Sequence, residues 1–230
     1  MKDLLRQLCP PLAWRGLQSL KSSMFASRVA TGGGSNQDLD VYWDPRMAEM
    51  LEHWGEGNAW NEIQLLLANC SGRTLDIACG TGKTMSLLAH FPALEVHGCD
   101  ISDMLISKAV QRGIPQSRLA LMDATAMSYP DASFQWGYSI GSLEHFTEDG
   151  IDKLLRECSR VVSEATFHMI PVSRSGRDEG WIKTFQSYHN NSVKWWEDKC
   201  RGAYASVRVL DSSWADQISL GKWLMCRKEP

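Results

Sequence analysis

The chain has 230 residues, enough for one sizeable domain with an appendage and too few for two full domains. Hydrophobic residues make up 43% and charged residues 22%, which is ordinary for a globular protein. The formal net charge is only −3, so overall charge gives no reason to expect a nucleic-acid partner. Seven cysteines are scattered without any Cys-x-x-Cys pair, which favours a reducing compartment over a disulfide framework or a zinc site.

Residues 1–28 carry five basic residues against one acid, with leucines and aromatic residues between the charges. The segment lacks an uninterrupted apolar run and a small-residue cleavage site, so a secretory signal is not expected. A cationic amphipathic segment can lie on an anionic membrane surface, or it can pack as a helix against the rest of the chain. We therefore expect a cytoplasmic protein, with peripheral membrane contact through residues 1–28 as an open alternative.

A glycine-rich stretch at 31–37 separates this appendage, residues 1–40, from a single domain predicted over 41–230. The domain should begin with a helix, because Met47, Met50, Leu51 and Trp54 are spaced i, i+3, i+4 and i+7. A second helix is predicted at about 59–68.

Predicted strands and helices then alternate along the chain. The strands are expected at 74–78, 95–100, 118–122, 134–140 and 165–172. The helices between them are expected at 83–90, 102–112 and 149–160. This alternation predicts an α/β fold with a doubly wound, mostly parallel sheet.

The most informative stretch is 74–84, where a short apolar strand carrying Asp76 opens into a turn with Gly80 and Gly82. Glycines without a Cβ let the backbone bend tightly and approach a ligand closely. Twenty residues after Gly80, a second apolar strand ends at Asp100. An acid at the tip of the second strand of a βαβ unit is placed to accept hydrogen bonds from ribose hydroxyls.

Two phosphate-binding interpretations fit this turn poorly. A Walker loop needs a glycine where this chain has Ile77, and the dinucleotide fingerprint needs a third glycine where it has Met85. The carboxylate of Asp76 would also repel a phosphate. It suits instead an adenosine-type cofactor that carries an ammonium and a sulfonium group.

Residues 75–82 resemble the first motif of the class I S-adenosylmethionine-dependent methyltransferases, and residues 98–102 resemble the second. Residues 121–124, 134–140 and 141–146 resemble the later motifs, in the same order. The resemblance implies a Rossmann-like, seven-stranded sheet with an antiparallel C-terminal edge strand. It implies S-adenosylmethionine as the cofactor, with Tyr42 and Trp43 as part of a lid over it. These two side chains could equally pack on the sheet. The implied cofactor contacts are Asp76, Ala78, Gly80, Thr81, Gly82, Asp100, Ile101, Asp123, Ala124, Ser139, Ile140 and Tyr42.

His145 follows the fourth strand and is our candidate general base, because imidazole suits removal of a hydroxyl proton near neutral pH. Alternatively, Glu144 and His145 anchor this loop by hydrogen bonds. Some members of the family bind magnesium through Glu-x-x-Glu-His. This chain has Gly141 in the first position, so we predict no metal. His168, inside the fifth strand, is expected to be a core residue.

The tail differs in composition. Residues 173–200 form an insertion on the acceptor side, polar up to residue 189 and followed by a predicted helix at 191–201. Strands at 205–210 and 218–226 would then form an antiparallel pair at the sheet edge, as the resemblance implies. The side chains of Trp181, Trp195 and Trp196 could line an acceptor pocket or pack in the core.

The predicted function is methyl transfer from S-adenosylmethionine to a small-molecule or glycan-type acceptor, at a hydroxyl oxygen. The basic start and the Trp-containing tail at 213–223 resemble parts of bacterial surface-polysaccharide methyltransferases, which would make the acceptor glycan- or lipid-linked. One alternative is a natural-product or quinone-type O- or N-methyltransferase. Another is a non-catalytic protein that binds S-adenosylmethionine. A nucleic-acid substrate is not expected.

Overall fold

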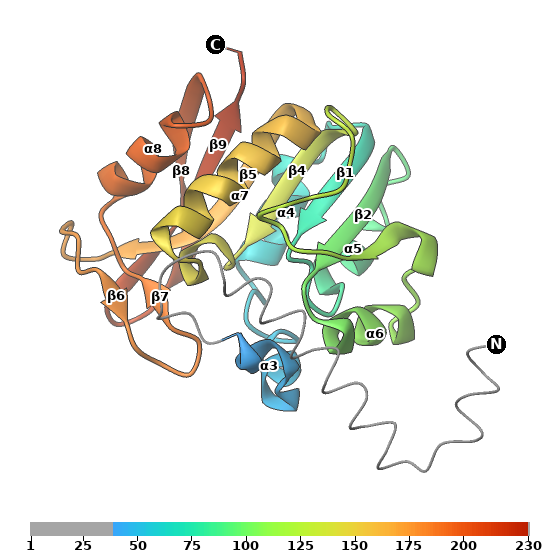
Figure 1. The fold of residues 1–230 in the computed structure, drawn as a ribbon, viewed down its shortest axis with the longest axis horizontal. Helices are drawn as coiled ribbons and strands as arrows, with labels where there is room; N and C mark the ends of the chain where they lie inside the picture. The colour runs from blue at the N-terminus through green and yellow to red at the C-terminus, as the bar shows by residue number, and fades with distance from the viewer. Residues whose placement is uncertain (1–38, 230) are drawn as a thin grey trace. The chain divides into compact units, whose positions relative to one another are not determined.

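The computed structural model describes residues 39–229 (Figure 1). The basic segment 1–28 and the glycine-rich stretch lie outside the described residues, so membrane contact through that segment stays a prediction. Within the described range, no helix is both long enough and apolar enough to cross a membrane.

Seven strands form one sheet in the order β3-β2-β1-β4-β5-β9-β8. Neighbouring strands among the first five pair in parallel, and β9 runs antiparallel to both β5 and β8. The strands are β1 (Gly72–Ile77), β2 (Leu94–Asp100), β3 (Leu119–Leu121), β4 (Phe134–Ile140), β5 (Val162–Ser173), β8 (Ser206–Ala215) and β9 (Ser219–Arg227). This arrangement confirms the predicted doubly wound sheet, and it inserts the antiparallel strand β9 between β5 and the outermost strand β8.

Helices cover both faces of the sheet and enclose two apolar cores. In Figure 1, α7 and α8 lie in front of the sheet and α4 lies behind it. The helices beside the sheet are α4 (Ala59–Leu66), α5 (Lys83–Leu88), α6 (Asp103–Gln111), α7 (Glu148–Val161) and α8 (Val193–Arg201). The short elements are η1 (Asp40–Trp43), α3 (Pro45–Met50), η2 (Gln116–Arg118), η3 (Leu143–His145) and the two-stranded hairpin β6 (Trp181–Ile182) with β7 (Tyr188–His189).

Local sequence signals explain where the helices that frame the site begin. Helix α6 follows Ser102, whose hydroxyl accepts a hydrogen bond from the backbone N–H of Leu105. Helix α7 follows Thr147, whose hydroxyl accepts from Gly150 N–H, and it has acidic residues in its first turn. Both caps satisfy amide groups that have no partner inside the helix, and the acids complement the positive helix end.

The first predicted helix is shorter than its apolar spacing suggests. Helix α3 ends at Met50, and Leu51 and Trp54 lie in the turns that follow. Gly57 has a left-handed φ of 77° in this stretch, which a helix does not contain. The two apolar side chains reach the glycine turns at Gly80 and Gly141, at the edge of the sheet.

Met85, which stands where the dinucleotide fingerprint has its third glycine, packs against a glycine of strand β2. A Cβ added to Gly98 in β2 would lie 2.6 Å from the sulfur of Met85 and 2.9 Å from the Cβ of Cys79. Gly98 therefore makes the room that a third glycine in helix α5 would otherwise provide.

Candidate active site

The turn after β1 has a backbone conformation that is unfavourable for most residues other than glycine. Ala78, Gly80 and Gly82 have φ values of 59°, 53° and 70°, all in the left-handed region. The N–H of Cys79 donates to the carbonyl of Cys99, which ties the turn to the end of β2. A left-handed alanine is a strained residue, and such strain is concentrated at ligand sites because the surrounding structure must hold it.

Asp100 at the tip of β2 holds this turn in place. Its Oδ2 accepts a hydrogen bond from Gly80 N–H at 2.8 Å, and its Oδ1 accepts from Ser102 N–H at 2.9 Å. Burial raises the pKa of Asp100 to about 6, although these amide hydrogen bonds oppose the rise. Each carboxylate oxygen keeps a lone pair, so a ribose hydroxyl can still donate to it.

Asp76 lies one strand away, buried and only 4% exposed. Its Oδ2 has no hydrogen-bond partner among residues 39–229. Burial raises the pKa of Asp76 well above its usual value. The hydroxyl of Tyr138, opposite Asp76 on β4, opposes that rise, although it makes no hydrogen bond of normal geometry with any described residue. A buried carboxylate oxygen without a partner fits a site for a cationic ligand group, such as an ammonium.

The remaining predicted cofactor residues occupy the same edge of the sheet with different side-chain roles. Asp123 follows β3, and its Oδ1 accepts hydrogen bonds from both the N–H and the hydroxyl of Thr125 at 2.8 Å. Ala124 beside it is buried. Ser139 is also buried, but its hydroxyl contacts Nδ1 of His168 at 2.8 Å, so its side chain is engaged inside the sheet. Its backbone alone remains for a ligand.

Thr81, inside the glycine turn, and Ile101, directly after Asp100, complete the predicted set around β1 and β2. Thr81 is 1% exposed and Ile101 is half-buried. The carbonyl of Thr81 accepts from Nε of Arg112 at 2.9 Å, and the guanidinium of Arg112 also pairs with Glu52. The turn is thereby connected to the segment that follows α3.

That segment lies over the turns at the ends of β1 and β4. A Cβ added to Gly80 would lie 2.9 Å from a methyl carbon of Leu51, and one added to Gly141 would lie 2.9 Å from the ring of Trp54. At its other end, Trp43 Nε1 donates to Oδ1 of Asp103 at 2.8 Å, beside the second motif. The stretch from η1 to Trp54 therefore lies over the predicted cofactor edge, and its role as a lid stays a prediction.

Tyr42 connects this stretch to the insertion at residues 173–200. Its hydroxyl accepts a hydrogen bond from Nε2 of Gln186 at 3.4 Å, in the loop between β6 and β7. The guanidinium of Arg46 in α3 lies 4.8 Å from the ring centre of Phe185 in the same loop. The insertion and the lid thus meet across the sheet edge.

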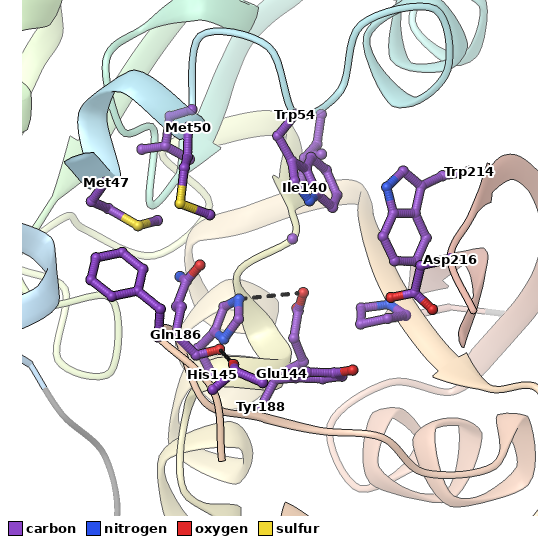
Figure 2. A pocket seen from close by; sticks show the side chains of 15 residues that line it. Met47, Met50, Trp54, Ile140, Glu144, His145, Gln186, Tyr188, Trp214 and Asp216 are labelled. Carbon is purple, nitrogen blue, oxygen red and sulfur yellow. Dashed lines mark hydrogen bonds and ion pairs between the residues drawn. The ribbon is translucent and has the colours of Figure 1, made fainter. Parts of the chain in front are cut away.

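A cavity of about 260 Å³ opens where these segments meet (Figure 2). Its walls come from the lid, the end of β4, η3, the β6–β7 loop and the turn after β8. They are mainly apolar and aromatic, and the principal contributors are Met47, Met50, Trp54, Ile140, Phe185 and Trp214. Of the predicted residues, His145 and Ile140 line this cavity.

His145 has a defined tautomer in this cavity. Its Nδ1 lies 2.9 Å from the carbonyl oxygen of Ser187, which can only accept, so Nδ1 carries the hydrogen and Nε2 carries the lone pair. Burial lowers the pKa of His145 to about 4, so the ring is neutral at pH 7.

Glu144 lies beside His145 and is buried as well, with its Oε1 3.6 Å from His145 Nε2. Burial raises the pKa of Glu144 to about 8. At pH 7 this contact therefore joins two neutral groups. Within the described range, no group of three His, Cys, Asp or Glu side chains is arranged to hold a metal ion, and the prediction of no metal stays a prediction.

Of the two uses expected for Trp181, Trp195 and Trp196, the structure shows packing away from this cavity. Trp196 is fully buried in the core, and Trp195 contacts it edge to face and packs against the ring of His189. The cavity uses Trp54 and Trp214 instead, whose ring centres lie 5.5 Å apart. Their separation in sequence is large, so no local pattern would have paired them.

Comparison with known proteins agrees with this geometry. Residues 74–165 match a family described as methyltransferase domain. The O-methyltransferase cnsE of Penicillium expansum is 34% identical over 133 residues, covering 53% of this chain and 48% of that protein. The chain thus spans about half the length of the curated relatives it matches.

Two solved structures share the fold at low sequence identity. Phosphoethanolamine N-methyltransferase 2 of Haemonchus contortus, in complex with S-adenosyl-L-methionine, has a TM-score of 0.64 at 17% identity, covering 86% of this chain and 61% of that one. The (4+2)-cyclase SpnF has a TM-score of 0.63 at 15% identity, covering 93% and 96%. A cyclase on the same fold shows that the fold alone does not decide the reaction. The family match over residues 74–165, the relatives and the strand order together support a class I S-adenosylmethionine-dependent methyltransferase domain in this chain.

Proposed function

We propose that the chain transfers a methyl group from S-adenosylmethionine to a hydroxyl oxygen of a small-molecule acceptor. The cofactor, when bound, supplies a methyl carbon activated by an adjacent positive sulfur. Asp76 would accept a hydrogen bond from its ammonium group, and Asp100 would accept from its ribose while keeping the glycine turn fixed. Asp123 and Ala124 would contact the adenine, as in the family that the motifs resemble.

The observation that carries this proposal is the tautomer of His145. The Ser187 carbonyl holds the hydrogen on Nδ1, so the Nε2 lone pair faces a cavity beside the cofactor edge. A neutral imidazole in that position can take the proton of an acceptor hydroxyl as the oxygen becomes methylated. Oε1 of Glu144 lies 3.6 Å from Nε2 of His145, and both side chains line the same cavity.

The cavity also favours one kind of acceptor among those the sequence left open. Its walls of methionine and aromatic side chains suit a planar, apolar molecule better than a sugar, and the O-methyltransferase relative supports oxygen as the acceptor atom. A natural-product or quinone-type compound fits this description. A glycan-linked acceptor finds less support in the described residues.

Incubation with methyl-labelled S-adenosylmethionine and a library of hydroxyl, amine and carboxylate compounds tests the proposal. We expect label in hydroxyl compounds, and a His145→Gln variant should lose about 10²- to 10⁴-fold in turnover. S-Adenosylmethionine should bind this variant as tightly as it binds the wild type, because His145 contacts the acceptor side. Tight cofactor binding without transfer to any compound would instead support the non-catalytic alternative.

A further inference from the structure

The carboxyl group of Glu144 is buried with its hydrogen bonding incomplete. The side chain is 3% exposed, and its Oε2 makes no hydrogen bond with any residue of the described range. A buried carboxyl with incomplete hydrogen bonding is destabilising, so its position among the residues that line the cavity points to a polar ligand group beside it.

Glu144 and His145 present two polar atoms side by side. Both residues belong to η3 and both line the cavity, with Glu144 Oε1 3.6 Å from His145 Nε2 (Figure 2). Nδ1 of His145 is engaged by Ser187, so Nε2 and the Glu144 carboxyl are the polar atoms of η3 side chains left for an acceptor. An acceptor with two adjacent hydrogen-bonding groups can contact Nε2 and the carboxyl at the same time.

The side chains that line the cavity disfavour an anionic acceptor. Its lining, as far as the chain is described, holds two acids, Glu144 and Asp216, and neither lysine nor arginine. His145 is neutral at pH 7 because burial lowers its pKa to about 4. A carboxylate or phosphate on the acceptor would therefore lose its hydration without gaining a cation.

We infer that Glu144 determines acceptor specificity and that the acceptor is an uncharged planar compound with two adjacent hydroxyl groups, of the catechol type. The inference rests on the proposed function and names its substrate class. One hydroxyl loses its proton to His145 Nε2 and gains the methyl group on its oxygen. The second hydroxyl keeps its proton and donates it to the Glu144 carboxyl. Burial raises the pKa of Glu144 to about 8, which agrees with an uncharged partner at pH 7.

Three probes of similar shape test this inference by calorimetry on the full chain loaded with S-adenosylhomocysteine at pH 7. We expect 4-methylcatechol to bind about tenfold more tightly than 4-methylphenol, because it makes one more hydrogen bond. 4-Methylbenzoate should show the weakest binding of the three.

Two variants of Glu144 separate a role in recognition from a role in folding. Glu144→Leu should lower the affinity for 4-methylcatechol to that for 4-methylphenol, whereas Glu144→Gln keeps a carbonyl oxygen and should keep the preference. S-Adenosylhomocysteine should bind all three proteins equally, which shows that each is folded.

Several outcomes would overturn the inference. They are equal binding of the catechol and the phenol by the wild type, a benzoate that binds as tightly as the catechol, and a Leu variant that keeps the catechol preference. If S-adenosylhomocysteine binds and none of the probes does, this inference fails while the cofactor part of the proposed function stands. If S-adenosylhomocysteine itself does not bind, the proposed function fails and the inference fails with it.

Discussion

The backbone N–H of Gly80 donates a hydrogen bond to Oδ2 of Asp100 over 2.8 Å, and this bond joins the two motifs that define the cofactor edge. The residues are twenty positions apart in sequence but lie at the ends of adjacent parallel strands. The acid available to a ribose is thus the same group that fixes the glycine turn. Changes in its charge should affect cofactor binding through both roles.

Cofactor affinity should depend on pH through Asp100. Burial raises the pKa of this acid to about 6, and the ionised form is the better hydrogen-bond acceptor. We therefore expect affinity for S-adenosylmethionine to fall as the pH is lowered through about 6. Calorimetry between about pH 5 and 8 measures this. Asp100→Asn should bind more weakly and without that dependence, and an unchanged pH slope in Asp100→Asn would show that another group is responsible.

Asp76 should lower the stability of the cofactor-free protein while strengthening cofactor binding. Its raised pKa means that the folded chain holds a proton that the unfolded chain has released, so this acid makes the cofactor-free protein less stable as pH rises above about 4. Asp76→Asn should therefore raise the free energy of unfolding of the cofactor-free protein at pH 8 by roughly 1–3 kcal/mol, which a higher Tm would report. The same variant should bind the cofactor more weakly.

Asp211→Asn is the matched control, because Asp211 is largely exposed on β8. It should change neither the Tm nor the affinity measurably. A lower Tm for Asp76→Asn at pH 8 would mean that the carboxylate stabilises the empty site.

The sheet could be predicted from sequence because each of its parallel strands is a short apolar run followed by a turn signal. The predicted strand at 95–100 and the observed β2, Leu94–Asp100, differ by one residue. The glycine turn and its two acids were equally visible, since their spacing is local to one βαβ unit.

The acceptor cavity could not be predicted in the same way. Trp54 and Trp214 form one wall from segments that meet only in the tertiary structure, and Leu51, directly after helix α3, lies against Gly80. Tyr138 was missed although strand alternation could have found it. Asp76 and Tyr138 are paired in register on neighbouring strands, so Tyr138 rather than Ser139 faces the acid.

Gly98 should be intolerant of any side chain. Its added Cβ would lie 2.6 Å from the sulfur of Met85 and 2.9 Å from the Cβ of Cys79. Gly98→Ala should lower the free energy of unfolding by about 1–3 kcal/mol, because the overpacked strand must shift. Chemical denaturation measures the loss.

A double-mutant cycle tests whether the contact with Met85 causes the stability lost in Gly98→Ala. Adding Met85→Ala should recover part of the stability of Gly98→Ala, because the methionine tip would no longer occupy the space. Strictly additive effects would rule out the contact with Met85 as the source.

His168 should make the fold sensitive to acid. Burial lowers its pKa to about 4, so between about pH 6.5 and 4 the unfolded chain binds a proton that the folded chain does not. Stability from this residue is present above that window and is lost as pH falls through it, on the order of 3 kcal/mol in all.

Denaturant midpoints at about pH 7 and 4.5 test this contribution in His168→Gln. The variant should lose less stability on acidification than the wild type. His145 contributes in the same direction, because its pKa is also lowered to about 4, so part of the acid sensitivity should remain. Identical losses in both proteins would contradict the role of His168.

A crystal structure of the chain with S-adenosylhomocysteine would show whether the two acids hold the cofactor. The ammonium group should contact Asp76, the ribose should contact Asp100 beside the Gly80 turn, and the sulfur should face the cavity that contains His145. A nucleoside bound elsewhere, or carboxylates of Asp76 and Asp100 turned away from it, would contradict the proposed site and the function built on it.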